Sequence, residues 1–507
     1  MKSKKIITIE NLKRKNHKKN IDICLTHGVF DFLHVGHKRY LEKAKSYGDL
    51  LIVSITTDKY VNKGPSRPIF NEYLRAEMIA SLEAVDYVIL NDAETAVNII
   101  NQIKPNFYVK GKDYKNLKGD LTKNIYKEKN AVEKNGGKIV FTEEIQFSSS
   151  SIINNFYKPE AILNEIKRLK FDPKYFSEMC LTSLKEISSL KVAIVGEIIF
   201  DEYIFSKEMD KPSKENIHAV NFKKKENYLG GVLAIAKNLS QFSKKIDIYS
   251  SGSFNLVEKK LIQSIKSNFK NISLNLEKSD FQTIKKTRIL NEENKKIFEI
   301  YYKNGSNKYS KNKNFLKTIE RKFDKYDVVM ICDFGHGFFC KKVYEKIIKK
   351  SKKVSINVQT NSDNRGFNLI TKYKKGNLVS IDEPEIRLAL SDRHSNIETM
   401  SKNLSKKIKF DFLVVTRGNS GITIFKKNGQ SKFKSISLPA FELRPLDTIG
   451  AGDTVFGIVS LLQSKKVDIA ILAFLGNMFG AFATRYLGHS SYIKRNDIIK
   501  AITYSLK

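Results

Sequence analysis

One stretch near the start of the chain, residues 26–37, constrains the fold and the chemistry more than any other. It reads Thr-His-Gly-Val-Phe-Asp-Phe-Leu-His-Val-Gly-His and stands between an apolar run, residues 21–25, and an amphipathic run, residues 38–47. This order predicts a buried strand, a tight turn and a helix. Backbone N–H groups and the helix dipole at such a turn favour a bound anion.

Two histidines of this stretch, His34 and His37, are three residues apart and share a face of the first helical turn. Gly36 between them lets a ligand approach the backbone closely. Two imidazoles beside a helix N-terminus can bind phosphate oxygens and stabilise the charge that develops during group transfer. A histidine pair alone would more often be a chance metal-ligand spacing or a surface pair, but the whole stretch predicts phosphate chemistry.

Length and composition limit the class of protein. A chain of 507 residues is expected to form two or three domains. No apolar run reaches the length of a membrane span, and the basic residues 1–20 lack the apolar centre of a signal peptide, so we expect a cytoplasmic protein without a membrane partner. The net charge of +36 comes mainly from lysines spread along the chain, which indicates a compositional bias rather than nucleic-acid binding.

Short apolar runs alternate with amphipathic runs from residue 21 onward, which predicts a parallel sheet covered by helices on both faces. The expected strands are 21–26, 50–56, 86–90, 107–110 and 138–141, and the expected helices are 35–47, 72–82, 95–103 and 122–135. Ligands of such sheets bind at the carboxyl ends of the strands. The predicted organisation is a lead-in over 1–20, a first domain over 21–157, a helical linker over 158–190 and a second domain over 191–507.

Three further segments of the first domain fit a nucleotide site. The basic loop 63–68 is either a solvated turn or a cationic cover for phosphates, residues 109–114 end a strand, and the serine run 148–151 precedes an expected helix. A serine run is usually a linker, but its hydroxyls and free N–H groups could hold a triphosphate. The predicted nucleotide-binding residues are Thr26, Gly28, Phe30, Asp31, Lys63, Arg67, Gly111, Asp113, Ser149, Ser150 and Ser151.

These motifs resemble the HxGH signature of the nucleotidyltransferase superfamily. With Arg75 and residues 66–68, 82–86, 109–114 and 148–153, the region is similar to the adenylyltransferase domain of the bifunctional heptose kinase/adenylyltransferases. Glycerol-3-phosphate cytidylyltransferases belong to the same superfamily, so the resemblance leaves open whether ATP or CTP is the substrate. His27 departs from the pattern, because relatives usually carry Asn or another small residue there.

A second phosphate-binding motif lies at residues 447–454, Asp-Thr-Ile-Gly-Ala-Gly-Asp-Thr. Its glycine-rich part, Gly450, Ala451 and Gly452, exposes consecutive N–H groups at the start of an apolar helix and so predicts an anion hole for a transferring phosphoryl group. Asp453 then lies where it can accept the proton of an attacking hydroxyl. GxGD alone would be a common loop pattern, but the flanking residues of this motif make the signal specific.

Residues 190–507 resemble the ribokinase-like (PfkB) sugar kinases. The resemblance implies that Asp453 is the catalytic base beside the 450–452 anion hole. It further implies sugar contacts from Asp201, Gly230 and Gly231, an ATP site bordered by Thr416, Gly418 and Asn477, and indirect organisation of Mg²⁺ by Glu385.

Two departures from the kinase pattern concern the substrates. Ala234 replaces an Asn that relatives often carry after the Gly-Gly pair, which indicates an altered sugar, and Asp382 replaces the Asn of the family's Asn-x-x-Glu. Asp can still hold water around a cation. The polar stretch 357–362 either supplies different contacts to the sugar or is a plain loop.

The sequence therefore predicts an α/β protein with two doubly wound domains: an N-terminal Rossmann-like nucleotidyltransferase and a C-terminal ribokinase-like kinase, in the reverse of the order known from the heptose enzymes. The expected function is bifunctional synthesis of a nucleotide-activated sugar from sugar phosphates and nucleoside triphosphates, which the resemblance links to surface polysaccharide precursors. A kinase fold that only binds sugar is the alternative, and a homodimer stays open.

Overall fold

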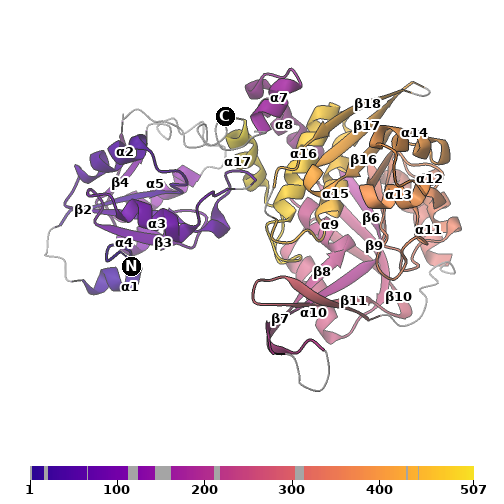
Figure 1. Ribbon diagram of the computed structural model, residues 1–507, viewed down its shortest axis with the longest axis horizontal. Helices are drawn as coiled ribbons and strands as arrows, with labels where there is room; N and C mark the ends of the chain where they lie inside the picture. The colour runs from indigo at the N-terminus through magenta and orange to yellow at the C-terminus, as the bar shows by residue number, and fades with distance from the viewer. Residues whose placement is uncertain are drawn as a thin grey trace. The chain divides into compact units, whose positions relative to one another are not determined.

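The computed structural model describes residues 3–15, 21–65, 67–111, 124–142, 162–210, 217–302, 313–429, 432–442 and 445–506. The chain forms two compact units, the first made of Met1–Ser177 with Asn496–Lys507 and the second of Glu178–Arg495. Both are α/β units built on parallel strands, as the sequence predicts (Figure 1). The segment after Arg495, which the sequence analysis assigned to the second domain, lies in the first unit.

The first unit contains a five-stranded parallel sheet with the order β3-β2-β1-β4-β5. The five strands, all expected from the apolar runs, are β1 (Ile23–Gly28), β2 (Leu50–Thr56), β3 (Tyr87–Asn91), β4 (Phe107–Gly111) and β5 (Lys138–Thr142). Because β1 is central and its neighbours β2 and β4 run parallel to it, the carboxyl ends of all three meet at one edge. The histidine stretch follows β1 at this edge.

Helices cover the two faces of this sheet. They are α1 (Ile9–Arg14), α2 (Val35–Lys45), α3 (Glu72–Ala80), α4 (Val97–Ile103) and α5 (Asn124–Lys134). The first unit also contains α7 (Ile162–Arg168) and most of α17 (Arg495–Ser505). Alternate residues of β2 enter different cores, with Leu51 and Val53 on one face and Ile52 on the other. Burial on both faces explains why the strands appear in the sequence as continuous apolar runs.

The second unit is built on a nine-stranded sheet with the order β10-β9-β6-β13-β14-β15-β16-β17-β18. Its strands are β6 (Lys191–Gly196), β9 (Lys245–Ser253), β10 (Ile272–Gln282), β13 (Val328–Asp333), β14 (Val354–Val358), β15 (Leu378–Asp382), β16 (Phe412–Thr416), β17 (Ile422–Asn428) and β18 (Lys432–Leu438). The strands from β10 to β16 are parallel, and β17 and β18 extend the sheet antiparallel.

A four-stranded sheet, β12-β11-β7-β8, lies beside α9 and α10 of the second unit (Figure 1). Its strands are β7 (Ile198–Glu208), β8 (Val220–Gly231), β11 (Ile284–Leu290) and β12 (Lys296–Tyr302). Strands β7 and β8 pair antiparallel, which sets Asp201 and Tyr228 opposite each other. Strand β11 pairs with β7 and brings Lys286 to the position opposite Asp201.

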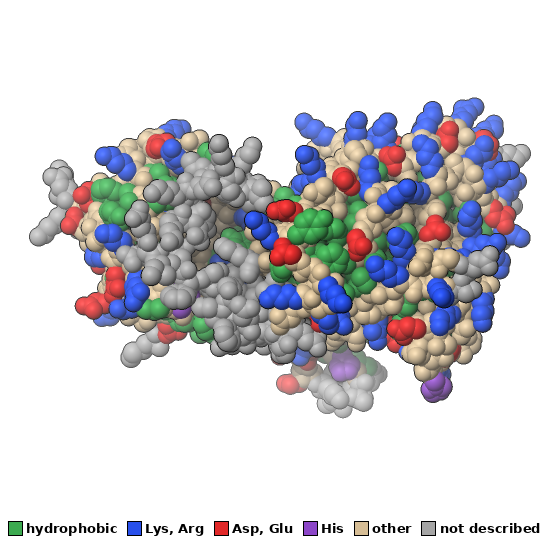
Figure 2. Space-filling model, turned by 90° about the horizontal axis from the view of Figure 1, so that it is seen from above, with side chains coloured by type: hydrophobic (Ala, Val, Ile, Leu, Met, Phe, Trp, Pro, Cys, Tyr) green, Lys and Arg blue, Asp and Glu red, His purple; other side chains and the backbone are tan. Residues whose placement is uncertain are grey.

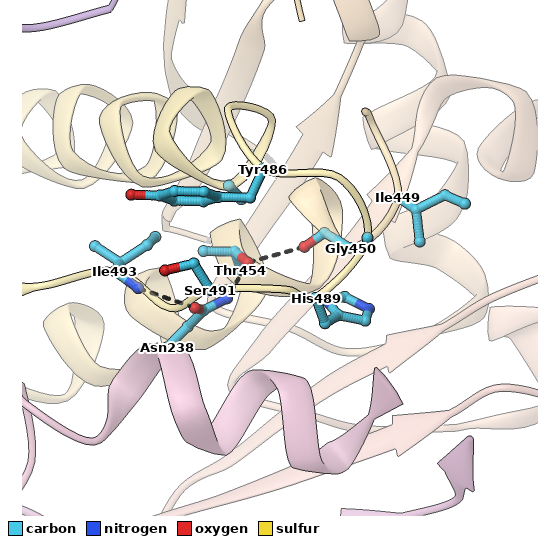
Figure 3. Close-up of a pocket in the computed structure, with 10 residues that line it drawn as sticks. Asn238, Ile449, Gly450, Thr454, Tyr486, His489, Ser491 and Ile493 are labelled. Carbon is cyan, nitrogen blue, oxygen red and sulfur yellow. Dashed lines mark hydrogen bonds between the residues drawn. The ribbon is translucent and has the colours of Figure 1, made fainter. Parts of the chain in front are cut away.

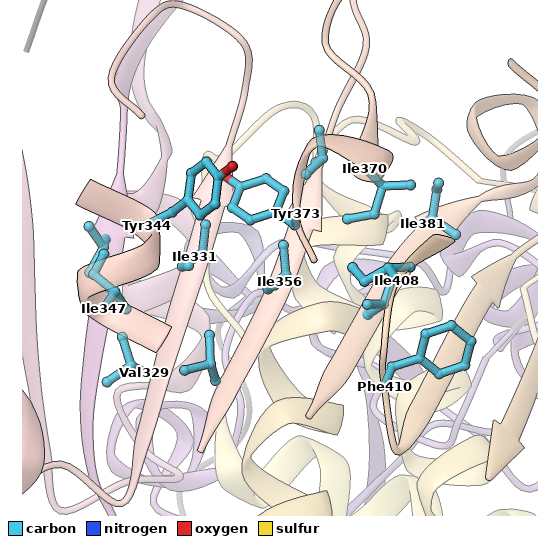
Figure 4. Packing of buried hydrophobic residues seen from close by; sticks show 14 of the residues in the cluster. Val329, Ile331, Tyr344, Ile347, Ile356, Ile370, Tyr373, Ile381, Ile408 and Phe410 are labelled. Carbon is cyan, nitrogen blue, oxygen red and sulfur yellow. The ribbon is translucent and has the colours of Figure 1, made fainter. Parts of the chain in front are cut away.

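Helices pack on the nine-stranded sheet and enclose its core. They are α8 (Pro173–Ile187), α9 (Val232–Leu239), α10 (Leu256–Asn268), α11 (Lys313–Lys322), α12 (Lys341–Lys350), α13 (Glu383–Leu390), α14 (Ile397–Lys407), α15 (Ala451–Ser464) and α16 (Ile469–Ala483). Figure 4 shows part of the core, where Ile331 and Ile356 of neighbouring strands lie beside the tilted rings of Tyr344 and Tyr373.

The basic residues that give the chain its net charge of +36 are spread over the surface. Lysine and arginine side chains are spread over the visible face of the second unit with acidic side chains between them, rather than gathered in one patch (Figure 2). Among the described residues, the helices are too short or too polar to cross a membrane.

Candidate active sites

The turn after β1 brings the two histidines of the HxGH stretch together. His34 is the N-cap of α2, and its Nδ1 accepts a hydrogen bond of 3.1 Å from the Gly36 N–H. The ring centroids of His34 and His37 are 4.0 Å apart. Both imidazoles therefore lie at the positive end of a helix, which is the arrangement that favours a phosphate ligand.

His37 is largely buried and lies near two other basic side chains. Burial, followed by the charges of His34 and Lys63, lowers the pKa of His37 to about 3. His37 is therefore neutral at neutral pH and keeps both a donor and an acceptor nitrogen. A neutral imidazole donates a hydrogen bond to a phosphate oxygen without carrying a proton that the ligand could remove.

A buried arginine, Arg75 of α3, binds the backbone of the turn that follows β1. Its guanidinium donates to the carbonyl oxygens of Val29 at 2.5 Å, Thr56 at 2.8 Å and Phe70 at 2.9 Å, and it pairs with Asp58 at 2.6 Å. These bonds join the ends of β1 and β2 to the start of α3. The resemblance named Arg75 only as a matching position, and the structure shows that its bonds are to the protein.

Asp31 and Arg67, both predicted to bind nucleotide, form a buried ion pair with 2.5 Å between Nε and Oδ2. The other oxygen of Asp31 accepts the N–H of Ile69 at 2.6 Å. The carboxylate therefore anchors the 67–70 loop to the HxGH turn. Contact of either side chain with a nucleotide remains a prediction.

His27, the residue that departs from the family pattern, is half-buried against β2. Its Nδ1 lies 2.9 Å from Ser54 Oγ and its Nε2 lies 3.3 Å from Thr56 Oγ1. Burial first, and then the positive charge of Lys110, lowers its pKa to about 4, so the ring is neutral at neutral pH. Lys110 also donates to the His27 carbonyl at 3.3 Å. His27 thus replaces a smaller side chain without adding a charge.

The remaining predicted residues of this site divide into two groups. Gly28, Phe30 and Gly111 lie at the ends of β1 and β4, and the fully buried Thr26 Oγ1 has no hydrogen-bond partner within the described ranges. A buried hydroxyl without a partner is uncommon in proteins and fits the prediction that Thr26 binds nucleotide, which remains a prediction. Four predicted residues, Asp113, Ser149, Ser150 and Ser151, lie outside the described residues.

The kinase motif forms the N-terminus of α15. Gly450 has φ +77°, and a Cβ at this position would be 2.3 Å from Cε1 of His489, so only glycine fits the turn. Ala451 and Gly452 open the helix, and Asp453 follows in its first turn. The N–H groups of the first turn and the carboxylate therefore lie together, as the motif predicts.

Asp453 is buried among polar side chains. Burial raises its pKa to about 7, while the charge of Lys286 opposes that rise and Asp201 adds to it. Gln359 Nε2 donates to Asp453 Oδ1 at 2.5 Å. Gln359 belongs to the polar stretch 357–362, and this bond favours the interpretation that the stretch supplies polar contacts at the site.

Asp201, the predicted sugar-binding carboxylate, already has two partners. Arg288 of β11 pairs with its Oδ1 at 2.5 Å, and His489 Nε2 lies 3.8 Å from its Oδ2. Gly230 lies across the strand pair, where a Cβ would be 2.2 Å from Asp201 Oδ2. Gly231, with φ +59°, makes the turn into α9.

We expect Gly230→Ala to raise the kinase KM for the sugar at least about tenfold, because the new methyl group must displace the Asp201 carboxylate, and overpacking of this kind costs about 1–3 kcal/mol. Steady-state kinetics and thermal denaturation of the full chain measure both effects. Lys223→Ala, an exposed position on the same strand, is the control. An unchanged KM for the sugar would exclude Asp201 from the sugar site.

The candidate Mg²⁺ residue, Glu385, lies at the start of α13. It forms a capping box with Asp382, and its Oε1 accepts the N–H of Thr360 at 2.7 Å. Burial, followed by the charges of Asp382 and Asp453, raises its pKa to about 8. Among the described residues no group of three His, Cys, Asp or Glu side chains is placed to hold a metal ion directly, and the cap bonds of Glu385 fit an indirect role through water.

The predicted ATP-site residues lie toward the antiparallel end of the sheet. Thr416 ends β16 and Gly418 follows it with φ +52°. Asn477 on α16 donates to the Pro439 carbonyl at 2.5 Å and accepts the N–H of Phe441 at 3.4 Å. Asn477 therefore holds the segment 439–441. The position of Asn477 near adenine, and of Thr416 and Gly418 at the border of the ATP site, remains a prediction.

A polar cluster supports the anion hole from the side of α9. Asn238 Nδ2 donates to Thr454 Oγ1 at 2.9 Å, and its Oδ1 accepts the N–H of Ile493 at 3.2 Å. These residues line a small pocket with Gly450 and His489 (Figure 3). One turn after Ala234, α9 thus supplies an asparagine that fastens the start of α15.

Several residues of the kinase site were not found from the sequence. They are Asn238, Lys286, Arg288 and His489. Lys286 and Arg288 are two residues apart, so on a strand they share one face, and this spacing was the only local indication of a basic surface there. The pairing that places this strand beside Asp201 is not visible in the local sequence.

The two sites agree with the families that the chain matches. Residues 25–155 match the cytidylyltransferase-like family, and residues 189–495 match the pfkB family carbohydrate kinases. Because the second match covers more than half of the chain, the chain belongs to the pfkB carbohydrate kinase family.

Individual relatives match single parts of the chain. Over 108 residues it is 51% identical to the bifunctional protein HldE of Aliarcobacter butzleri, covering 21% of this chain and 23% of that protein. Over 170 residues it is 36% identical to the bifunctional protein HldE of Helicobacter pylori, covering 33% of this chain and 32% of that protein. The chain thus matches only a quarter to a third of the length of these curated relatives. Phosphofructokinase-2 of Escherichia coli shares the fold, with a TM-score of 0.50 and 11% identity over 62% of this chain and 99% of that one.

Proposed function

We propose that the chain is a bifunctional enzyme that makes a nucleotide-activated sugar. The second unit phosphorylates a sugar or sugar phosphate with MgATP, and the first unit joins AMP to a sugar phosphate. The observation that supports the proposal is the presence, in one chain, of two helix N-termini whose side chains suit a phosphate ligand. One carries the adjacent imidazoles of His34 and His37, and the other carries the buried carboxylate of Asp453.

In the kinase step, a sugar hydroxyl attacks the γ-phosphorus of ATP while its proton passes to Asp453. The bond between the γ-phosphorus and the bridging oxygen breaks, and ADP leaves. The N–H groups at the start of α15 stabilise the transferring phosphoryl group. Glu385 and Asp382 would hold water around a Mg²⁺ ion bound with ATP, and that ion would supply neutralisation of phosphate charge.

In the transferase step, an oxygen of the sugar phosphate attacks the α-phosphorus of the nucleoside triphosphate. The bond between the α-phosphorus and the bridging oxygen breaks, and pyrophosphate leaves. His34 and His37 hold the phosphates and stabilise the charge of the transition state. Positioning and charge stabilisation suffice, and no covalent enzyme intermediate is required.

The kinase rate should rise with pH through about pH 7, because Asp453 accepts a proton only when ionised and its raised pKa is about 7. Below that pH the turnover should fall about tenfold for each pH unit. Gln359→Leu removes a hydrogen bond to the ionised carboxylate and should move the midpoint to higher pH. Kinase turnover measured against pH tests both statements. A profile of the unsubstituted chain without a midpoint near pH 7 would contradict the first, and an unchanged midpoint in Gln359→Leu would contradict the second.

A screen of nucleoside triphosphates against sugar and polyol phosphates, read by pyrophosphate release, tests the transferase assignment. We expect release with ATP and a sugar phosphate. Release with CTP alone would replace AMP by CMP in the proposal. The transferase assignment fails if no acceptor supports release with either nucleotide.

A further inference from the structure

The loop after β14 connects two carboxylates of the kinase site. Gln359 Nε2 donates to Asp453 Oδ1 at 2.5 Å, and the N–H of the next residue, Thr360, donates to Glu385 Oε1 at 2.7 Å. Asp453 begins α15 and Glu385 begins α13, yet both bind adjacent residues of one loop. The position of this loop therefore affects both carboxylates.

The backbone of Gln359 is held on both sides by residues that are distant in sequence. Its N–H donates at 2.9 Å to the carbonyl of Asp333, at the end of β13, and its own carbonyl accepts a hydrogen bond of 3.0 Å from Asn368 Nδ2. Asn368 is nine residues further along the chain and is 7% exposed. Ordering a long glutamine side chain costs conformational entropy. A fixed backbone limits the positions that its amide can reach, so these two bonds favour the contact with Asp453.

Asn368 is itself fixed by a buried charged group. Its Oδ1 accepts a hydrogen bond of 2.6 Å from Lys372 Nζ, and its Nδ2 lies 3.3 Å from Asp333 Oδ1. Lys372 forms an ion pair with the other carboxylate oxygen of Asp333, which also accepts the Tyr373 hydroxyl at 2.7 Å. The Tyr373 ring belongs to the core of the nine-stranded sheet (Figure 4). An unbroken series of contacts thus runs from this core through Asp333 and Asn368 to Gln359 and Asp453.

We propose that Asn368 is a positioning residue for the kinase base, and that it acts through Gln359, whose amide orients the carboxylate of Asp453 toward the sugar hydroxyl. With Oδ1 bound by the amide, Oδ2 accepts the proton of that hydroxyl. Asn368 itself touches no reacting atom. This inference rests on the proposed kinase reaction with Asp453 as its base.

Asn368→Ala in the full chain tests this role. The measurement is ADP formation from MgATP with the fastest acceptor in a panel of aldoses, ketoses and their monophosphates. We expect kcat to fall about tenfold, as for a slightly displaced catalytic group, while KM for ATP and for the acceptor changes less than about twofold. Gln359→Leu should lower kcat at least as much. The double variant should be no slower than Gln359→Leu alone, because Asn368 acts only through that amide.

The matched control is Asn364→Ala, in the same loop. Asn364 is 9% exposed, and its Nδ2 binds the carbonyl oxygens of Phe334 at 3.3 Å and Gly335 at 3.1 Å rather than that of Gln359. Its loss should lower the melting temperature about as much as Asn368→Ala, because each variant leaves buried carbonyl groups without a partner, but kcat should stay within about twofold of the wild type.

Equal kcat values in Asn364→Ala and Asn368→Ala would overturn the inference. So would effects of Gln359→Leu and Asn368→Ala on the activation free energy that simply add in the double variant. If Asn368→Ala does not fold, Asn368→Leu, which keeps the branched shape of the side chain and removes its hydrogen bonds, decides the question against the same control.

Asp453→Asn belongs in the same series, because it separates the inference from the function on which it rests. Full ADP formation in that variant would refute the proposed kinase reaction itself. Its loss, beside an Asn368→Ala variant with the kcat of the Asn364→Ala control, would refute only the role of Asn368.

Discussion

Asp453→Asn should lower kinase turnover about a thousandfold, because the amide cannot accept the proton of the attacking hydroxyl. The substitution keeps the size of the side chain, so Gln359 and the start of α15 should stay in place. ADP formation with a sugar acceptor measures the effect. Pyrophosphate release by the first unit should be unchanged in the same preparation.

The matched control is Asp210→Asn, which makes the same change at an exposed position. ATP turnover that survives Asp453→Asn at the level of this control would contradict the assignment of the base. It would favour the alternative in which the kinase fold only binds a sugar. In that alternative, the Asp201–Arg288 ion pair would contribute to sugar binding but not to catalysis.

Loss of either imidazole of the HxGH stretch should reduce pyrophosphate release by about a hundredfold to a thousandfold, the effect of removing one donor from a preorganised anion site. His37→Ala removes one ring. His34→Asn removes the other and keeps an N-cap for α2, since alanine at this position would also cost about 1 kcal/mol of helix stability.

Val35→Ala is the control for both variants, because Val35 lies between the histidines and is 51% exposed. Melting temperatures within about 2 °C of the wild type would show that the fold is kept. Kinase turnover should be equal in all three variants. A histidine variant that releases pyrophosphate as fast as Val35→Ala would show that the ring does not contact the phosphates.

Much of the fold follows from periodicity. The buried strands β1 to β5 appear as apolar runs because both of their faces are covered, and the helices between them carry an apolar stripe. The positions of the two motifs could be predicted because glycine, histidine and aspartate at the start of an amphipathic or apolar run indicate the N-terminus of a helix. His34 with His37, and Gly450 with Asp453, lie at helix starts as expected.

The rest of the sites depends on contacts between distant segments. Arg288 reaches Asp201 only because β11 pairs with β7, and Gln359, just after β14, reaches Asp453 in the first turn of α15. A helical pattern over α17 shows that one face is buried but not which unit buries it. The ion pair of Asp31 and Arg67 likewise joins two residues that the sequence analysis considered separately.

The path of the chain affects the order in which the units can fold. The first unit contains residues from before and after the second, so the kinase unit is an insertion in the transferase unit. Domains fold as they emerge during synthesis. The kinase unit can therefore complete its fold while α17 is still unmade, and the transferase unit closes last. A chain that ends within α16 would lack α17, whose Asp497 accepts a hydrogen bond from Asn62 in the loop after β2. Truncation within the kinase unit would therefore also leave the first unit incomplete.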